Sequence, residues 1–201
     1  MVAAALSDVC PTTLLVILPH QADVDWSCDD LALFAAAPAM AFPAWESETR
    51  ERLLHDEIFG QRLRVLKQLA AVDSRPRVVA TSIQSLLQPT ASRVELAEAS
   101  REIAVEQVID PEEFCQWLVD RGCTRTTAVE LPGEFSLRGG ILDVFAPDAS
   151  LPLRIELFGD EVASIRTFDV GTQRSVDTLE SAEVTMLPPN ARHRAHLSEH
   201  L

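Results

Sequence analysis

The sequence predicts two consecutive regions, an α/β layer followed by an α+β domain that is rich in β-strands. Residues 1–96 alternate short apolar runs with longer segments of helical periodicity, the pattern of parallel strands joined by helices. Six of the seven glycines lie beyond residue 120, where the predicted elements become short strands. Residues 1–96 carry 12 acidic and 8 basic side chains, whereas residues 97–189 carry 18 and 7. We therefore place a domain boundary at about residue 97 and treat residues 190–201 as a tail or the start of a following domain.

The elements of the first region follow from its hydrophobic pattern. Residues 13–18 (TLLVIL) form a continuous apolar run, as expected for a strand buried on both faces of a parallel sheet. Between residues 48 and 72, leucine and isoleucine recur at steps near three and four, which predicts a long amphipathic helix that Gly60 breaks or kinks. We predict further strands over 39–42 and 77–81, a helix over 20–37, and a short helix through Leu87 that ends at Pro89.

The second region is predicted to hold one well-marked helix and several strands. Asp110 suits an N-cap, Pro111 the first helical position, Glu113 a capping box, and Gly122 the stop after the helix. Residues 153–158 alternate between the two faces expected of a half-buried antiparallel strand. Turn residues separate the strands that we predict over 125–131, 134–138, 140–145, 152–158, 161–169 and 180–187.

The composition excludes several classes of function. The 201-residue chain has a formal net charge of −14, which disfavours a general nucleic-acid or anionic-membrane surface. It contains no tyrosine, so a base-stacking platform would have few rings. The four cysteines have no metal-ligand spacing, and we expect Cys115 and Cys123 to be buried free thiols, as in a reducing compartment. No run approaches the ~20 apolar residues of a membrane span, and the N-terminus lacks the positive segment of a signal peptide. We expect a cytoplasmic protein that binds no membrane.

No motif of enzyme chemistry is apparent. A phosphate-binding loop needs glycines and a lysine at the start of a helix, but Lys67 is the only lysine and residues 1–59 lack glycine. Adjacent acidic pairs at 29–30, 112–113 and 160–161 are better explained as partners of helix ends and turns than as catalytic carboxylates. Three histidines near the C-terminus (His193, His196 and His200) are expected on a solvated terminal helix, not in a metal site. We predict no catalytic residue, no cofactor and no metal.

A longer pattern carries a family resemblance. The stretch Gly133–Asp169 contains GEFSLRGGILDVF, then an arginine-containing strand that ends in phenylalanine, then a DEV turn and IRTFD. This ordered string resembles the UvrB-interaction module that the excision-repair protein UvrB shares with the bacterial transcription-repair coupling factors. The closing MLPP (residues 186–189) resembles the exit of that module into the following domain.

The upstream residues favour the coupling factors over UvrB. FPAWES (residues 42–47), the Arg62-Leu63 pair with Leu66, and VVATSIQSLLQP (residues 78–89) resemble the coupling factors. The resemblance covers about residues 12–189 and implies a partial, P-loop-like UvrB domain 1a without a functional P-loop, followed by the interaction domain. The start of the first domain, the RNA-polymerase-binding module and the translocase motor have no counterpart here. We therefore interpret the chain as a fragment or truncated homologue.

The resemblance implies a docking function. In the family this module binds UvrA, and the matching contact positions are Arg138, Arg154 and Phe158. Arg154 and Phe158 lie four apart on one predicted strand and so share a face, and arginine beside an exposed aromatic is typical of interface hot spots. The alternative is that Arg154 pairs with Glu156 and that Phe158 caps the core.

Neighbouring residues are assigned supporting roles. Asp143 and Glu134 are candidates to order the arginines through bidentate pairs, while Arg166 and Arg174 are weaker candidates for the rim of the same patch. Gly139 and Gly140 are expected to form a tight turn that aims Arg138 outward.

The leading hypothesis is a non-catalytic module that binds UvrA and recruits nucleotide excision repair to stalled RNA polymerase. RNA polymerase and DNA would be partners only through parts of the parent protein outside this chain. Two alternatives stay open: a piece of an ATP-dependent DNA translocase whose motor lies elsewhere, or an autoinhibitory clamp that packs within that parent.

Overall fold

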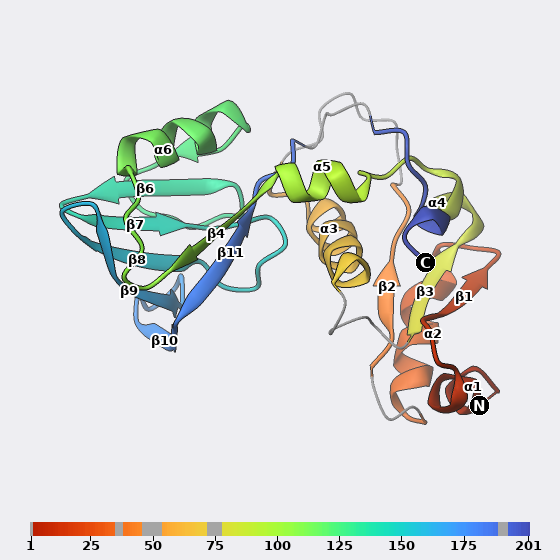
Figure 1. Cartoon of the computed structure of the whole chain (residues 1–201). Helices are drawn as coiled ribbons and strands as arrows, with labels where there is room; N and C mark the ends of the chain where they lie inside the picture. Colours follow the sequence, from red (N-terminus) through yellow and green to blue (C-terminus); the bar gives the residue numbers. More distant parts are fainter. Residues whose placement is uncertain (1, 35–37, 46–53, 72–77, 189–192) are drawn as a thin grey trace. The chain divides into compact units, whose positions relative to one another are not determined.

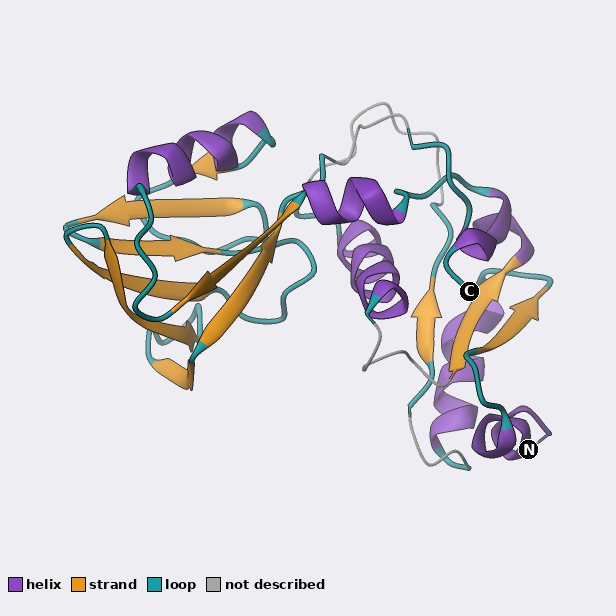
Figure 2. Ribbon diagram, viewed as in Figure 1, coloured by secondary structure: helices purple, strands orange, loops and turns teal. Residues whose placement is uncertain are grey.

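The computed structural model of the chain describes residues 2–34, 38–45, 54–71, 78–188 and 193–201. These residues form two compact units. Unit 1 comprises Met1–Arg50, Gln61–Glu95 and Arg192–Leu201, and unit 2 comprises Glu51–Gly60 and Leu96–Ala191. Helices and strands are mixed, and the strands are concentrated in unit 2 (Figure 2).

Unit 1 contains a parallel three-stranded sheet in the order β1-β3-β2 (Figure 1). Its strands are β1 (Leu14–Leu18), β2 (Met40–Phe42) and β3 (Val78–Ser82), and the central strand β3 is buried at every position. Leu14 pairs with Val78 and Phe42 pairs with Thr81. The predicted parallel α/β arrangement is confirmed, because the continuous apolar runs form the strands.

The helices of the first half are α1 (Val2–Val9), α2 (Ala22–Ala32), α3 (Glu57–Ala70), α4 (Ile83–Leu87) and α5 (Arg93–Glu98). The helices α2 and α3 are shorter than the sequence predicted, and α1 and α5 were not predicted. The helix predicted from residue 48 begins at Glu57, where Asp56 caps it by accepting the Ile58 N–H at 2.9 Å; residues 46–53 lie outside the described part. Gly60 does not break α3. A side chain at Gly60 would clash with the Pro147 carbonyl oxygen, so this close approach requires glycine.

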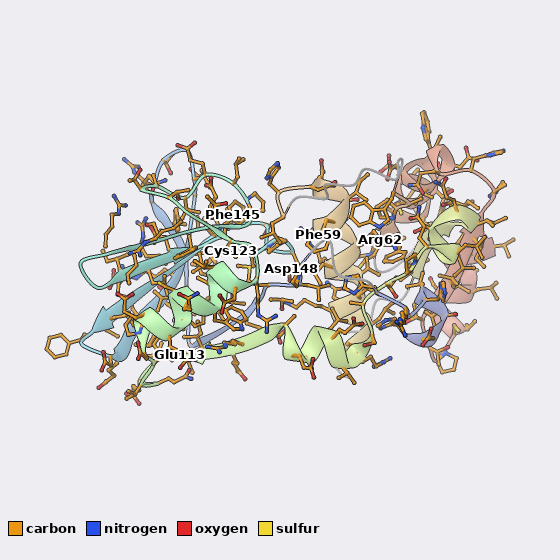
Figure 3. The ribbon with its side chains drawn as sticks, turned by 90° about the horizontal axis from the view of Figure 1, so that it is seen from above. Phe59, Arg62, Glu113, Cys123, Phe145 and Asp148 are labelled. Carbon is orange, nitrogen blue, oxygen red and sulfur yellow. The ribbon has the colours of Figure 1, made fainter. Side chains whose placement is uncertain are left out.

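A buried arginine organises unit 1 (Figure 3). Arg62 on α3 is 3% exposed, and its Nη1 donates to the Pro43 carbonyl at 2.6 Å and to the Ser85 hydroxyl at 2.7 Å. Its guanidinium carbon lies 4.2 Å from the centre of the Phe42 ring and 5.4 Å from that of Trp45. One guanidinium therefore joins α3 to the segments that follow β2 and β3.

The C-terminal residues pack onto unit 1, contrary to the prediction of a solvated helix. The short 3₁₀ helix η1 (Leu197–Glu199) is followed by His200, which is 1% exposed and lies 2.8 Å from the Ala91 carbonyl through Nε2. His193 Nδ1 lies 3.3 Å from Glu95 Oε1. The prediction failed because residues 90–95 supply a carbonyl, a carboxylate and a packing surface that periodicity in the tail cannot reveal.

His200 should make unit 1 sensitive to mild acid. Desolvation, with a smaller contribution from Arg93, lowers the pKa of His200 below its usual value, although Ala91 and Glu199 act in the opposite direction. The unfolded chain, with a histidine pKa of about 6.5, therefore binds a proton more readily than the folded one. The contribution of neutral His200 to the stability of unit 1 should be fully present above the unfolded-state pKa. It should be lost progressively as the pH falls below that pKa.

We expect the urea midpoint of unit 1, followed by fluorescence of the buried Trp45, to fall between pH 7 and pH 5. His200→Gln should flatten this dependence, because glutamine retains a hydrogen-bond donor but does not titrate. Identical pH profiles for the two proteins would contradict the assignment.

Unit 2 is built on a six-stranded sheet in the order β10-β9-β8-β7-β6-β5, with a separate antiparallel pair β4–β11. Its pairs are antiparallel except β5–β6, which is parallel. The strands are β4 (Ser100–Ala104), β5 (Thr124–Arg125), β6 (Glu134–Arg138), β7 (Ile141–Val144), β8 (Leu153–Phe158), β9 (Glu161–Phe168), β10 (Ser175–Leu179) and β11 (Ser181–Thr185). The β-rich character predicted for this region is confirmed.

The single long helix of unit 2, α6 (Pro111–Asp120), begins and ends close to the predicted positions. The Asp110 carboxylate accepts the backbone N–H groups of Glu112 and Glu113 at 2.9 and 3.1 Å. Gly122 follows the helix with a φ of +88°. The predicted capping role of the Glu113 side chain is wrong, because its carboxylate instead pairs with Arg101 at 3.1 Å.

One predicted strand is largely absent and two strands were missed. Of residues 125–131 only Arg125 lies in a strand, β5, because the Glu134 carboxylate accepts the N–H groups of Glu130 and Leu131 and holds a turn. The missed strands are β4 and β10. Buried and exposed side chains hardly alternate in these two strands, because β10 is mostly exposed and β4 contains only one fully buried residue, Ile103. The sequence therefore lacks the two-residue period that predicts a strand.

Candidate protein-docking site

A tight turn places Arg138 at the end of a hairpin. Arg138 closes β6 and pairs with Ile141 across Gly139 and Gly140, whose φ values are +55° and +83°. Two consecutive positive φ angles are those of a type I′ turn, which glycine adopts without strain. A side chain on Gly140 would also lie 3.0 Å from the Leu157 carbonyl. The Arg138 side chain is exposed, as predicted.

Arg154 on β8 is held in a network and is not free. Its Nε and Nη2 donate to the two carboxylate oxygens of Asp143 at 2.8 and 2.9 Å, the predicted bidentate pair. The remaining donors reach Gln173, its carbonyl at 3.4 Å and its side-chain oxygen at 3.2 Å. The guanidinium carbon lies 4.2 Å from the centre of the Phe168 ring. Only 19% of the Arg154 side chain and 4% of that of Asp143 are exposed.

This network fixes the charge of Arg154. The hydrogen bonds to Asp143, supported by the charges of Asp143 and Glu156, raise the pKa of Arg154 against the opposing effect of burial. Asp143 pairs with Arg154 directly across the β7–β8 ladder, so the contact is part of the strand register. Sequence reasoning found the Asp143 pair but missed Phe168 and Gln173. The one signal in the sequence that pointed to these two contacts was the presence of arginine and aromatic residues between Gly133 and Asp169.

Phe158 at the end of β8 is 85% exposed. It pairs with Glu161 across the β8–β9 turn and lies on the same face of β8 as Arg154. The alternative in which Phe158 caps the core is wrong, because a side chain this exposed buries almost none of its surface. An aromatic ring left in water at a hairpin tip is available to a partner.

The other candidate residues have different roles. Glu156 does not pair with Arg154; it forms an ion pair with Arg166 at 3.3 Å and accepts the Ser164 hydroxyl at 2.9 Å. Glu134 does not order an arginine, because its carboxylate holds the 130–131 turn. Arg174 is exposed, in the segment between β9 and β10. The structure therefore brings Arg138, Arg154 and Phe158 onto one face, with Arg166 paired beside them.

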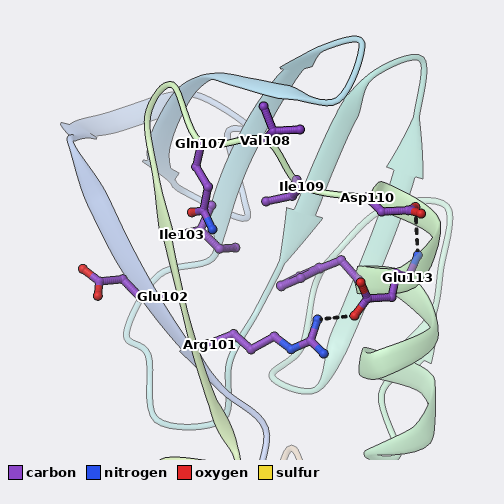
Figure 4. Close-up of a pocket in the computed structure, with 9 residues that line it drawn as sticks. Arg101, Glu102, Ile103, Gln107, Val108, Ile109, Asp110 and Glu113 are labelled. Carbon is purple, nitrogen blue, oxygen red and sulfur yellow. Dashed lines mark hydrogen bonds and ion pairs between the residues drawn. The ribbon is translucent and has the colours of Figure 1, made fainter.

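A cleft of about 220 Å³ lies in unit 2 between β4 and the start of α6. Ile109 points toward Ile103 inside it, whereas Val108 points away at its rim (Figure 4). Its one arginine, Arg101, is paired with Glu113, and Glu102 adds a further carboxylate. The volume is below the ~300–1,000 Å³ of typical ligand sites, and its lining residues include no cysteine, histidine or serine nucleophile.

The described residues contain no cluster of metal-ligating side chains and no disulfide. No group of three or more potential metal-ligating side chains occurs in that part of the chain. All four cysteines are free, and Cys115 and Cys123 are buried as predicted. Burial raises the pKa of Cys123 to about 12, which keeps it a thiol. No helix within the described ranges is long and apolar enough to cross a bilayer.

The β-rich unit with its exposed hairpin tips corresponds to a known family. Residues 102–190 match the family model described as the UvrB interaction domain, and this part of the chain belongs to that family. Over most of its length the chain is also homologous to bacterial transcription-repair-coupling factors, which confirms the resemblance seen in the sequence.

The curated relatives are much longer than this chain. The transcription-repair-coupling factor of Mycobacterium tuberculosis (strain CDC 1551) is 35% identical over 187 residues, which cover 90% of this chain and 15% of the relative. That of Bacillus subtilis (strain 168) is 37% identical over 161 residues, 78% of this chain and 13% of the relative. That of Staphylococcus aureus (strain NCTC 8325) is 49% identical over 83 residues, 41% of this chain and 7% of the relative.

Proposed function

We propose that unit 2 is a non-catalytic module that binds UvrA and so recruits nucleotide excision repair to stalled RNA polymerase. The observation that carries the proposal is Phe158, an aromatic side chain 85% exposed at a hairpin tip, on the same sheet face as the exposed Arg138. Exposed aromatic and arginine side chains on a rigid sheet are the residues that most often dominate binding energy.

Arg154 enters the proposal in two ways. The exposed fifth of its side chain can contact UvrA, while its bonds to Asp143 and Gln173 hold β8 and the segment before β10 in place. Unit 1 is proposed to be the UvrB-like domain 1a, a P-loop-like layer without nucleotide chemistry, which its parallel three-stranded sheet supports. RNA polymerase and DNA would be contacted through parts of the longer relatives that this chain does not match. The protein is proposed to act in the cytoplasm.

A calorimetric titration of the chain with purified UvrA tests the proposal. We expect Phe158→Ala and Arg138→Ala each to weaken binding by about 1–3 kcal/mol, because hot-spot side chains contribute on that scale. Arg125→Ala is the matched control, since Arg125 is exposed on the edge strand β5 and pairs with the buried Phe135 instead of with Arg138 or Phe158. Absence of binding by the unchanged chain, or normal binding by both variants, would refute the docking function.

A further inference from the structure

Strand pairing places a second exposed apolar side chain beside Phe158. Val108 forms an antiparallel bridge with Glu161, and Glu161 pairs with Phe158. Residues paired directly across a ladder point to the same face of a sheet. Val108 and Phe158 therefore lie on one face, two strands apart, with Glu161 between them. Ile109, the next residue, points the other way into the cleft (Figure 4).

The same reasoning continues toward Arg138. Phe158 and Glu156 share a face of β8, because the extra residue of the β8–β9 irregularity lies on β9. Glu156 pairs with Ile141, and Ile141 pairs with Arg138. Val108, Phe158, Ile141 and Arg138 thus share one face at the hairpin end of unit 2, with Ile141 and Arg138 in line with Glu156, two residues before Phe158. We call these four residues the hairpin row.

The apolar members of the hairpin row are all exposed. The exposed fractions are 72% for Val108, 85% for Phe158 and 40% for Ile141. Single exposed apolar residues are common on proteins, but here three lie on one face of the sheet, and only Glu161 separates Val108 from Phe158, so they form a patch. Val108 and Ile141 are three strand spacings apart, so the apolar part of the row extends over about 14 Å.

The backbone beneath the row is fixed by hydrogen bonds. Glu106 N–H donates to Val162 and Ile109 N–H donates to Asp160, both at 2.8 Å. Leu157 N–H donates to the Gly140 carbonyl at 2.7 Å, which joins the two hairpins. A row held in this way loses little conformational entropy when a partner binds.

The row also has a charge direction. Arg138 lies at one end, while the exposed carboxylates of Asp160 and Glu161 lie beside Val108 and Phe158 at the other. A complementary partner surface would present an apolar strip with a carboxylate opposite Arg138 and a cationic side chain opposite Glu161.

We infer that Val108 and Ile141 extend the docking surface of Phe158 and Arg138, and that the hairpin row receives an apolar strip of UvrA flanked by an acidic and a basic group. The inference rests on the proposed function and specifies the residues and the orientation of that contact. It predicts that Val108 and Ile141, which the family resemblance does not identify as contact residues, contribute to the affinity for UvrA.

Polar β-branched substitutions test the apolar part of the row. Val108→Thr and Ile141→Thr keep the β-branched shape, and we expect each to weaken UvrA binding about threefold and the double variant about tenfold. Val119→Thr is the matched control, because Val119 is 46% exposed on α6, outside the row. Unchanged thermal unfolding of each variant would show that the fold is intact.

The outcomes separate the inference from the proposed function. If Phe158→Ala weakens binding but the threonine double variant binds like the unchanged chain, UvrA docking stands and the hairpin row is overturned. Equal weakening by Val119→Thr would also overturn the row, because the effect would not be local. If the unchanged chain does not bind UvrA, both fall.

Charge reversal tests the orientation. Glu161→Arg should slow association with UvrA about threefold or more, and the difference from the unchanged chain should shrink as salt is raised. Faster association after this reversal would show that the partner presents an acidic group there and would overturn the proposed orientation.

Discussion

Replacing Asp143 with alanine is expected to destabilise unit 2 by about 2–4 kcal/mol. The substitution leaves the Arg154 guanidinium without its bidentate partner while the Phe168 ring keeps it in a mostly buried position. Losing one partner of a fully buried ion pair costs about 3–5 kcal/mol, and the exposed fifth of the Arg154 side chain lowers that figure. Urea unfolding followed by circular dichroism would measure the change.

Two further variants test whether the cost of Asp143→Ala comes from the unpaired positive charge of Arg154. Asp143→Asn keeps the shape and one acceptor and should cost less than alanine. The double variant Asp143→Ala with Arg154→Met should recover part of the loss, because an apolar side chain over Phe168 needs no counter-charge. If the double variant were no more stable than Asp143→Ala alone, the cost would not come from an unpaired arginine.

Arg62→Ala is expected to have the largest effect in unit 1, a destabilisation of about 3–5 kcal/mol. Removing the side chain opens a cavity among Phe42 and Trp45 and deletes the bonds to Pro43 and Ser85. The fluorescence of Trp45, which is 8% exposed, would report the loss during urea unfolding.

Matched variants make this prediction specific. Arg62→Lys retains the charge but not the planar fork, and should fall between alanine and the unchanged chain. Gln68→Ala, a half-exposed position on the same helix α3, should change stability by no more than about 0.5 kcal/mol. A small effect of Arg62→Ala would mean that the packing of α3 does not depend on the guanidinium.

Arg62 also explains why separate stretches of sequence carried the family resemblance together. FPAWES, the Arg62-Leu63 pair and VVATSIQSLLQP are far apart in the chain, yet Phe42, Pro43, Trp45 and Ser85 all contact Arg62. The pattern of residues was visible in the sequence. That these residues all contact the same guanidinium, that of Arg62, could be seen only in the structure.

Strong periodicity predicted most strands and the one capped helix correctly. The strands β6 to β9 alternate clearly, and glycine turns (β6–β7 and β8–β9) or a segment with Pro147 and Pro152 (β7–β8) separate them, so local signals agree with the final fold. The strand β4 was missed because its partner β11 lies about 80 residues away, and its short sequence has no local signal of its own. The turn at residues 130–131 was mistaken for a strand because Glu134, outside the run, captures its backbone N–H groups.

The candidate site was only partly predictable. The shared face of Arg154 and Phe158 follows from a two-residue period, and the structure shows it. Val108 could not be placed, because its bridge to Glu161 joins residues 53 positions apart in a segment without strand periodicity. Such pairings depend on tertiary structure and not on local propensity.

The β4–β11 pair has a mechanical consequence. Ser100 pairs with Thr185 at one end of this ladder, so the longer segment of unit 2, Leu96–Ala191, has its two ends close to this pair. A force that separates these two points loads the ladder one hydrogen bond at a time, from Ser100–Thr185 toward Ala104–Ser181, instead of shearing all bonds together. Each backbone bond contributes only about 1 kcal/mol, so the pair should peel apart under a small pull. The six-stranded sheet does not lie in that line of force and should remain folded while the pair opens.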